Sequence, residues 1–260
     1  KRKMKTVIIG SGNLATHLSM ALLRAGIPVC EVFSPTKAHA QELAERQGAR
    51  ALDSLKDVSA DADIVIISVK DDAIESVVAG LEHVNNDAIF IHTAGSVPLS
   101  VLSEKRKNAA VLYPLQTFSK TKELDFSIIP CFIEATNQRA LGIVKEMAEK
   151  ISNRVQIADS AVRRKIHLAA VFACNMANHC YYLADKILEE EGLDFDIMLP
   201  LIKETAEKVE TLSPRKAQTG PMVRNDITVM NAQKALLSDP LMIRLYELMA
   251  ESIHKSSTNR

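Results

Sequence analysis

Apolar residues in the first part of the chain form short, uninterrupted runs that alternate with helical patterns. The runs at 7–9, 64–69 and 88–92 are rich in β-branched residues and lack the alternation of a half-exposed strand. Such runs are typical of strands buried on both faces of a parallel sheet. Between them, apolar residues recur at helical spacing, which predicts amphipathic helices. The pattern therefore predicts an α/β fold with a doubly wound, mostly parallel sheet.

The pattern changes near Ala158, after which no strand-like run follows and the remaining residues have helical periodicity. Arg163 and Arg164, near the start of this region, are expected to be solvent exposed. Other predicted strands lie at 27–34, 50–52, 109–118, 130–135 and 154–157. Predicted helices lie at 13–25, 36–47, 73–82, 137–150, 160–191, 195–212, 227–237 and 240–254, with a loop at 213–224.

The first apolar run ends in a glycine-rich turn that predicts a binding site for a dinucleotide diphosphate. Gly10 would make the tight turn, Gly12 would let the main chain approach the diphosphate, and Ala15 would let the next helix pack closely. The N-terminus of that helix would direct unpaired N–H groups at the anion. The alternative is a turn that binds no ligand. The other residues of the predicted loop are Ser11, Asn13 and Leu14.

The end of the second predicted strand indicates which nicotinamide cofactor binds. In a Rossmann fold this place faces the adenosine ribose, and an acidic residue there selects NAD. Ser34, Thr36 and Lys37 stand there instead, and hydroxyls with a positive charge suit the 2′-phosphate of NADP. Glu31 has the spacing of an NAD-selecting acid but lies within the strand. The sequence therefore favours NADP over NAD. The alternative interpretation of Lys37 is an ordinary solvated lysine at the start of a helix.

Two later strand ends are predicted to line the nicotinamide half of the site. Val69 and Lys70 end one apolar run, and Thr93 and Gly95 follow the next. Ligands of doubly wound sheets bind beyond the carboxyl ends of the strands. We therefore include these four residues in the predicted cofactor site, with a solvated lysine or a simple turn as the alternatives.

Composition limits the classes of partner. The 260 residues include 32 basic and 32 acidic side chains, so nothing favours nucleic acid or an anionic membrane surface. A small-molecule substrate is expected. No apolar run is long enough to span a membrane, so we expect neither a signal peptide nor a transmembrane helix.

The four cysteines are scattered and show no spacing typical of a metal site. His179 and Cys180 are adjacent and would point about 100° apart on a helix, so no metal is predicted there. Reduced thiols in a cytoplasmic protein are the expected state.

Five segments carry a combination of residues that resembles one family: IIGSGNLA at 8–15, SVKDDA at 68–73, HTAGSVP at 92–98, YPLQTF at 113–118 and TGPMVRND at 219–226. The family consists of bacterial Rossmann-like proteins that are labelled NADP oxidoreductases and carry a helical C-terminal domain of unknown function. The resemblance spans nearly the whole chain. Together with the change of pattern near Ala158, it predicts a dinucleotide-binding Rossmann domain at 1–158 and a helical substrate and dimerisation domain at 159–260.

More distantly, the layout is similar to pyrroline-5-carboxylate reductase, ketopantoate reductase and the β-hydroxyacid dehydrogenases. In those proteins the helical domain supplies catalytic residues and forms dimers, so the resemblance implies a homodimer here. The β-hydroxyacid dehydrogenases carry a catalytic lysine and asparagine one turn apart on the first long helix. In this chain Lys165 is followed one turn later by Ala169, so that pair is absent.

The same predicted helix carries His167, Asn175 and Asn178 at spacings that place them on one broad face. His167 is the candidate proton donor, because an imidazole has an ordinary pKa near physiological pH. Asn175 and Asn178 would hold a substrate carbonyl or carboxylate. Arg224 and Asp226 would clamp a carboxylate and orient a partner. The alternatives are a structural histidine and an ion pair that holds a loop.

Two functions remain open. The first is an NADP-dependent oxidoreductase that transfers a hydride between the nicotinamide and a small carbonyl, imine or hydroxy acid. The second is a non-catalytic NADP-binding regulatory or scaffold protein, which the missing lysine–asparagine pair favours.

Overall fold

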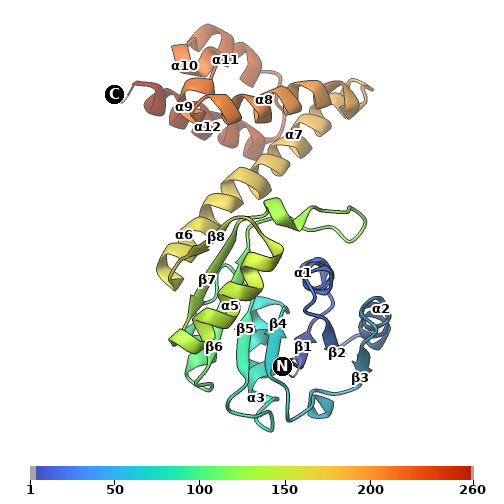
Figure 1. Cartoon of the computed structure of the whole chain (residues 1–260). Coiled ribbons are helices and arrows are strands. Elements are labelled where there is room, and N and C mark those ends of the chain that lie inside the picture. Colours follow the sequence, from blue (N-terminus) through green and yellow to red (C-terminus); the bar gives the residue numbers. More distant parts are fainter. Residues whose placement is uncertain (1–3, 259–260) are drawn as a thin grey trace. The chain divides into compact units, whose positions relative to one another are not determined.

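The computed structural model of the protein describes residues 4–258, in which the strands form an eight-stranded sheet of order β3-β2-β1-β4-β5-β6-β7-β8 (Figure 1). Neighbouring strands are parallel except β6 and β7, which are antiparallel. This confirms the predicted doubly wound, mostly parallel sheet. The strands are β1 (Thr6–Ile9), β2 (Val29–Phe33), β3 (Arg50–Leu52), β4 (Ile64–Ile67), β5 (Ile89–His92), β6 (Ala109–Pro114), β7 (Cys131–Ala135) and β8 (Val155–Ile157).

Two apolar cores cover the two faces of the sheet. In β1, Ile8 belongs to one core, whereas Val7 and Ile9 belong to the other, and all three are fully buried. Alternation of this kind, with apolar residues on both faces, explains why the strand reads as an unbroken apolar run. The first core contains α1 (Asn13–Arg24), α2 (Lys37–Gln47) and α5 (Gln138–Ile151), and the second contains α3 (Ile74–Ala79) and α4 (Ser100–Ser103).

All elements after β8 in the described residues are helical. The chain divides into two compact units between Asn175 and Met176. The N-terminal unit therefore includes α6 (Ser160–Ala170), whose Ile166 packs against buried residues of the sheet. The remaining helices are α7 (Ala177–Glu190), α8 (Leu199–Thr211), α9 (Pro214–Ala217), α10 (Pro221–Arg224), α11 (Ile227–Lys234) and α12 (Pro240–Thr258).

Two features of the helical part differ from the prediction. The segment expected to be a loop at 213–224 contains the short helices α9 and α10, each of which begins at a proline. The predicted long helix has a π-helical segment, Val171–Met176, between α6 and α7. Because a π-helix uses i→i+5 hydrogen bonds, it changes the rotation per residue. His167, Asn175 and Asn178 therefore need not share one face of a regular α-helix, as their spacing had predicted.

Arg163 is fully buried, so the expectation that it is solvent exposed is wrong. Its guanidinium forms an ion pair with Glu134 of β7 and donates a hydrogen bond to the carbonyl of Val97. Arg164 is exposed as predicted. Successive residues of a helix point about 100° apart, so only one of two adjacent arginines faces the sheet. Arg163 thus fixes the first helix after β8 to the sheet.

We expect Arg163→Met to lower the free energy of unfolding by about 3 kcal/mol, because it leaves the Glu134 carboxylate without its cation. Arg164→Met, which changes an exposed neighbour, should change it by less than about 0.5 kcal/mol. Urea unfolding followed by circular dichroism measures both. Equal stability of the two variants would show that the buried ion pair contributes nothing.

Candidate functional site

The larger cavity lies at the carboxyl ends of the central strands and has a volume of about 850 Å³. It includes the residues that follow β1, β2, β4 and β5. A cavity of this size falls in the range of small-molecule and cofactor sites. The predicted cofactor residues that line it are Gly10, Ser11, Gly12, Asn13, Leu14, Ser34, Val69, Lys70, Thr93 and Gly95.

Gly10 and Gly12 are glycines for different reasons. Gly10 has a φ of +115°, and a Cβ there would stand 2.1 Å from the carbonyl oxygen of Ser68. Gly12 has an ordinary φ of −69°, and a Cβ there would meet no protein atom within 4 Å. Neither backbone conformation nor packing requires glycine at position 12, and a side chain there would enter open space. This bare position fits a ligand that approaches the main chain, such as a diphosphate.

The N-terminus of α1 is free to bind an anion. Within the described residues, no side chain caps this end of the helix, and its first turn contains no acidic residue. Asn13, the first residue of the helix, instead donates its side-chain amide to the carbonyl of Phe118 at 2.8 Å. Unpaired N–H groups and the positive end of the helix dipole therefore point at the cavity end that Gly12 leaves bare.

Glu31 does not line this cavity, and its carboxylate is bound by residues of β3 and of the segment before β4. It accepts hydrogen bonds from Arg50 at 2.9 Å and from the backbone N–H of Ser59 at 3.0 Å. Burial alone would raise the pKa of Glu31, but the hydrogen bonds from Ser59 and Arg50 outweigh it and lower this pKa. At the end of β2 the cavity instead presents Ser34, whose Oγ accepts a hydrogen bond from Ser11 at 2.8 Å.

Thr36 and Lys37 are the predicted cofactor residues that do not line the cavity. Thr36 precedes α2 as its N-cap residue, and Lys37 forms an exposed ion pair with Asp53 at 2.6 Å. His39 of α2 and Lys120 of the loop after β6 line the cavity in their place. Sequence reasoning missed both. His39 carries no local signal, and Lys120 reaches the site only through the fold.

At the other end of the predicted cofactor site, Gly95 lies against an aromatic pair. The Oη of Tyr113 is 3.0 Å from Nδ1 of His167. A Cβ on Gly95 would stand 2.7 Å from both His167 Nδ1 and Tyr113 Cζ. Because Gly95 also lines the cavity, the pair lies directly behind the cavity wall. Tyr113 was not predicted as a site residue.

Electrostatics distinguish the two histidines near this strand end. Burial raises the pKa of Tyr113, with Arg163 acting against it and Asp71 adding to it, so the phenol keeps its proton. Burial, assisted by the charge of Arg163, lowers the pKa of His92 to about 3. His92 is therefore neutral at physiological pH and unsuited to proton transfer. His167, which contacts a neutral hydroxyl, is the better candidate.

The other predicted catalytic residues have separate surroundings. Asn175 is exposed near the end of the N-terminal unit, and Asn178 is exposed on α7. Arg224 is exposed at the end of α10. Asp226 caps α11 by accepting a hydrogen bond from the backbone N–H of Val229 at 3.2 Å. Of the predicted catalytic residues, His167 is the one that the N-terminal unit places beside the larger cavity.

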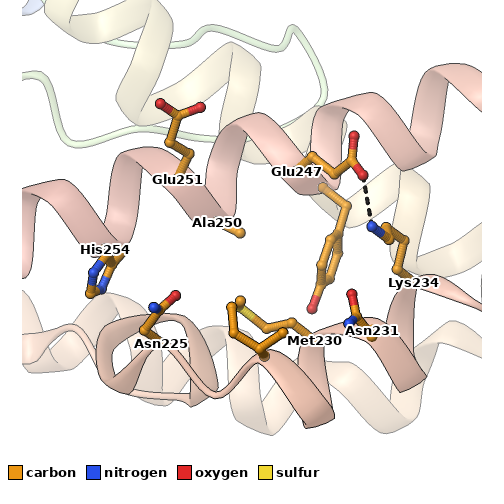
Figure 2. Close-up of a pocket in the computed structure, with 10 residues that line it drawn as sticks. Asn225, Met230, Asn231, Lys234, Glu247, Ala250, Glu251 and His254 are labelled. Atoms are coloured by element: carbon orange, nitrogen blue, oxygen red, sulfur yellow. Dashed lines mark hydrogen bonds and ion pairs between the residues drawn. The ribbon is translucent and has the colours of Figure 1, made fainter.

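The C-terminal unit contains a smaller cavity of about 320 Å³ between α11 and α12 (Figure 2). Lys234 and Glu247 line it and form an ion pair at 2.8 Å, so their charges compensate one another. Asn225 is the residue of the TGPMVRND segment that reaches this cavity. The phosphate-binding features described above belong to the larger cavity.

Two further findings concern the described residues 4–258. No three histidine, cysteine, aspartate or glutamate side chains gather closely enough to hold a metal ion. None of the helices combines the length and apolar character that crossing a bilayer requires.

We expect Gly10→Ala and Gly12→Ala to affect different properties of the protein. Gly10→Ala should lower the free energy of unfolding by about 2 kcal/mol or more, because both its φ and the Ser68 carbonyl oppose a side chain. Gly12→Ala should lower the free energy of unfolding by less, about 1 kcal/mol, because alanine is a poorer N-cap residue than glycine. It should weaken NADPH binding by about tenfold or more, since its methyl group enters the cavity. Calorimetry measures both. Unchanged NADPH affinity of Gly12→Ala would contradict a diphosphate at this loop.

Two family models match the chain. Residues 5–95 match the model described as NADP oxidoreductase coenzyme F420-dependent, and residues 129–253 match a domain of unknown function (DUF2520). No curated protein sequence matches the chain.

Solved structures resemble the chain along its length. A putative NADP oxidoreductase from Bacteroides fragilis is 45% identical with a TM-score of 0.92, over 97% of this chain and 98% of that one. A protein from Thermotoga maritima is 24% identical with a TM-score of 0.76, over 97% and 98%. An imine reductase from Myxococcus stipitatus in complex with NADP⁺ shares the fold, at 15% identity and a TM-score of 0.64, over 96% and 92%. The chain therefore belongs to the NADP oxidoreductase family in which this N-terminal domain precedes a DUF2520 domain.

Proposed function

We propose that the protein is an NADP-dependent oxidoreductase that transfers a hydride between the nicotinamide and a small carbonyl, imine or hydroxy-acid substrate. The observation that carries this proposal is the larger cavity, which has a bare phosphate loop at Gly12 and the Tyr113–His167 pair behind its wall at Gly95. The imine reductase that shares the fold binds NADP⁺.

The loop residues bind the diphosphate through main-chain N–H groups. Gly12 leaves the N-terminus of α1 accessible, and the larger cavity continues from there past Ser34 to Val69 and Gly95. The cofactor, when bound, supplies or accepts the hydride. What remains for the protein is to hold the diphosphate, orient the substrate and move one proton.

His167 is the group that moves this proton. Tyr113 occupies its Nδ1, which leaves Nε2 as the ring nitrogen available to substrate. A hydroxyl both donates and accepts hydrogen bonds, so the neutral phenol can accept a bond from Nδ1–H while Nε2 gains or loses a proton. The pair therefore keeps the imidazole oriented in both charge states, and His167 protonates a carbonyl or imine or deprotonates a hydroxy acid.

The absence of the lysine–asparagine pair favours the second candidate, a protein that binds NADP without catalysis. Lys165 is exposed and is followed one turn later by Ala169. The two candidates differ in turnover and not in cofactor binding. Activity measurements with bound NADPH therefore distinguish them.

We expect the wild-type protein to oxidise NADPH with one or more members of a panel of small ketones, cyclic imines and keto acids. His167→Asn should lower kcat by about 100-fold or more and leave the NADPH dissociation constant unchanged. Tyr113→Phe should have a smaller effect, because the ring is kept and only the hydrogen bond to Nδ1 is lost. His179→Asn, which replaces an exposed histidine of α7, is the matched control.

Three outcomes separate the hypotheses. NADPH binding without turnover of the panel supports the non-catalytic candidate. Turnover that His167→Asn leaves intact contradicts the role of His167. Lack of binding to either nicotinamide dinucleotide contradicts the proposed function as a whole.

We also propose that the protein is a homodimer that associates through its helical region. Among the described residues 176–258, Ala250 is the buried one, so this region has little core of its own. It exposes more large apolar side chains than is usual for the surface of a monomeric protein. They include Met176, Tyr181, Tyr182, Ile187, Leu193, Ile197, Leu199, Leu201, Val209, Leu212, Ile227, Val229, Leu236, Leu241, Leu248 and Met249.

We expect light scattering after size-exclusion chromatography to give twice the mass of one chain. The double variant Leu241→Glu with Leu248→Glu places charges two turns apart on the apolar surface of α12 and should give a monomer. Ile128→Glu changes an equally exposed apolar residue of the N-terminal unit and should remain a dimer. A monomeric wild-type protein would overturn the proposal.

A further inference from the structure

The loop after β6 returns to the cofactor cavity because it is fixed to α1. Asn13 donates its side-chain amide to the carbonyl of Phe118, and His17 donates Nε2–H to the carbonyl of Ser119, each at 2.8 Å. The ring of Phe118 also lies against His17 and Phe126, with centroids 5.6 and 6.1 Å apart. These contacts carry the next residue, Lys120, to the cavity wall.

Lys120 brings a positive charge that its neighbours do not fully compensate. Its Nζ is 3.9 Å from one carboxylate oxygen of Glu42, and the other oxygen of that carboxylate accepts a hydrogen bond from Arg46 at 2.8 Å. Two cations therefore share one anion. Lys37, by contrast, forms an ion pair of 2.6 Å with Asp53, so its charge is compensated. The excess positive charge near Lys120 therefore comes from Lys120 and Arg46, which share Glu42, and not from Lys37.

Two further polar groups line the same cavity. Ser34 stands at the end of β2, and because its Oγ accepts a hydrogen bond from Ser11, its own hydroxyl proton is free to be donated. His39, in the first turn of α2, lines the cavity as well. Hydroxyl, imidazole and ammonium groups of these three residues thus line one cavity, and the end of β2, where Ser34 stands, faces the adenosine ribose in a Rossmann fold.

We propose that Lys120 is the main cation that binds the 2′-phosphate of NADP, and that His39 and Ser34 donate hydrogen bonds to the same phosphate. This assignment rests on the proposed NADP-dependent function and replaces the expectation that Lys37 has this role. A phosphomonoester carries a charge of about −1.5 to −2 at neutral pH and has three strong acceptor oxygens. NAD has an uncharged hydroxyl at this place and therefore lacks the charge attraction to the ammonium group. Lys120 therefore favours NADP over NAD.

The test compares the binding of NADPH and NADH to single variants of the full chain by isothermal titration calorimetry. Lys120→Ala should weaken NADPH binding by about 10- to 100-fold, as expected for a lost hydrogen bond to a charged group, and should leave NADH binding unchanged. Lys120→Arg should retain most of the NADPH affinity, because it keeps the charge. Lys37→Ala is the matched control and should bind both dinucleotides like the wild type. Thermal unfolding checks that each variant is folded.

The outcomes separate this assignment from the proposed function. If the wild-type protein prefers NADPH and Lys120→Ala keeps that preference, the assignment is wrong while the function stands. Equal loss of NADPH and NADH affinity in Lys120→Ala also overturns it, since the residue would then only support the loop. A loss of NADPH affinity in Lys37→Ala would return the role to Lys37. Wild-type protein that binds neither dinucleotide overturns the function and the assignment together.

Discussion

The close approach of main chain at Gly10 is the constraint on which the rest of the site depends. The turn after β1 passes so near the carbonyl of Ser68, at the end of β4, that no side chain fits between them. This contact sets the phosphate loop beside the strand end that leads to Val69 and Lys70. Both cores then hold the arrangement, because β1 is buried by helices on each face. The cavity is thus a product of strand packing.

Much of the fold follows from local patterns. Unbroken β-branched runs identified the central strands, and glycine and proline marked several of the element ends. What the patterns could not supply depends on tertiary context. Arg163 and Arg164 are the same residue type and adjacent, yet only the packing of α6 on the sheet decides that one is buried. The π-helical segment at 171–176 likewise has no signal in the spacing of apolar residues.

The candidate site was predictable in its main-chain parts and less so in its side chains. The glycine fingerprint singled out Gly10 and Gly12, and both line the larger cavity, since the requirement there is local geometry. His167 was found by its residue type, but its partner Tyr113 comes from a strand 54 positions earlier in the chain. Gly95 was expected to line the nicotinamide half of the site, and the structure shows in addition that a side chain at this position would clash with that aromatic pair. Contacts between distant segments therefore account for most of what sequence reasoning missed.

The loop that Asn13 and His17 hold against α1 has a consequence for how coenzyme use changes during evolution. Its anchors are a helix amide, an imidazole and two backbone carbonyls, so the residue after them can be exchanged without disturbing the sheet. With the role proposed for Lys120, homologues that have identical residues at the end of β2 can differ in coenzyme choice, and comparison of that short motif alone would assign them wrongly. In that case position 120 is a second site, besides the end of β2, at which a substitution can change coenzyme choice without disturbing the sheet.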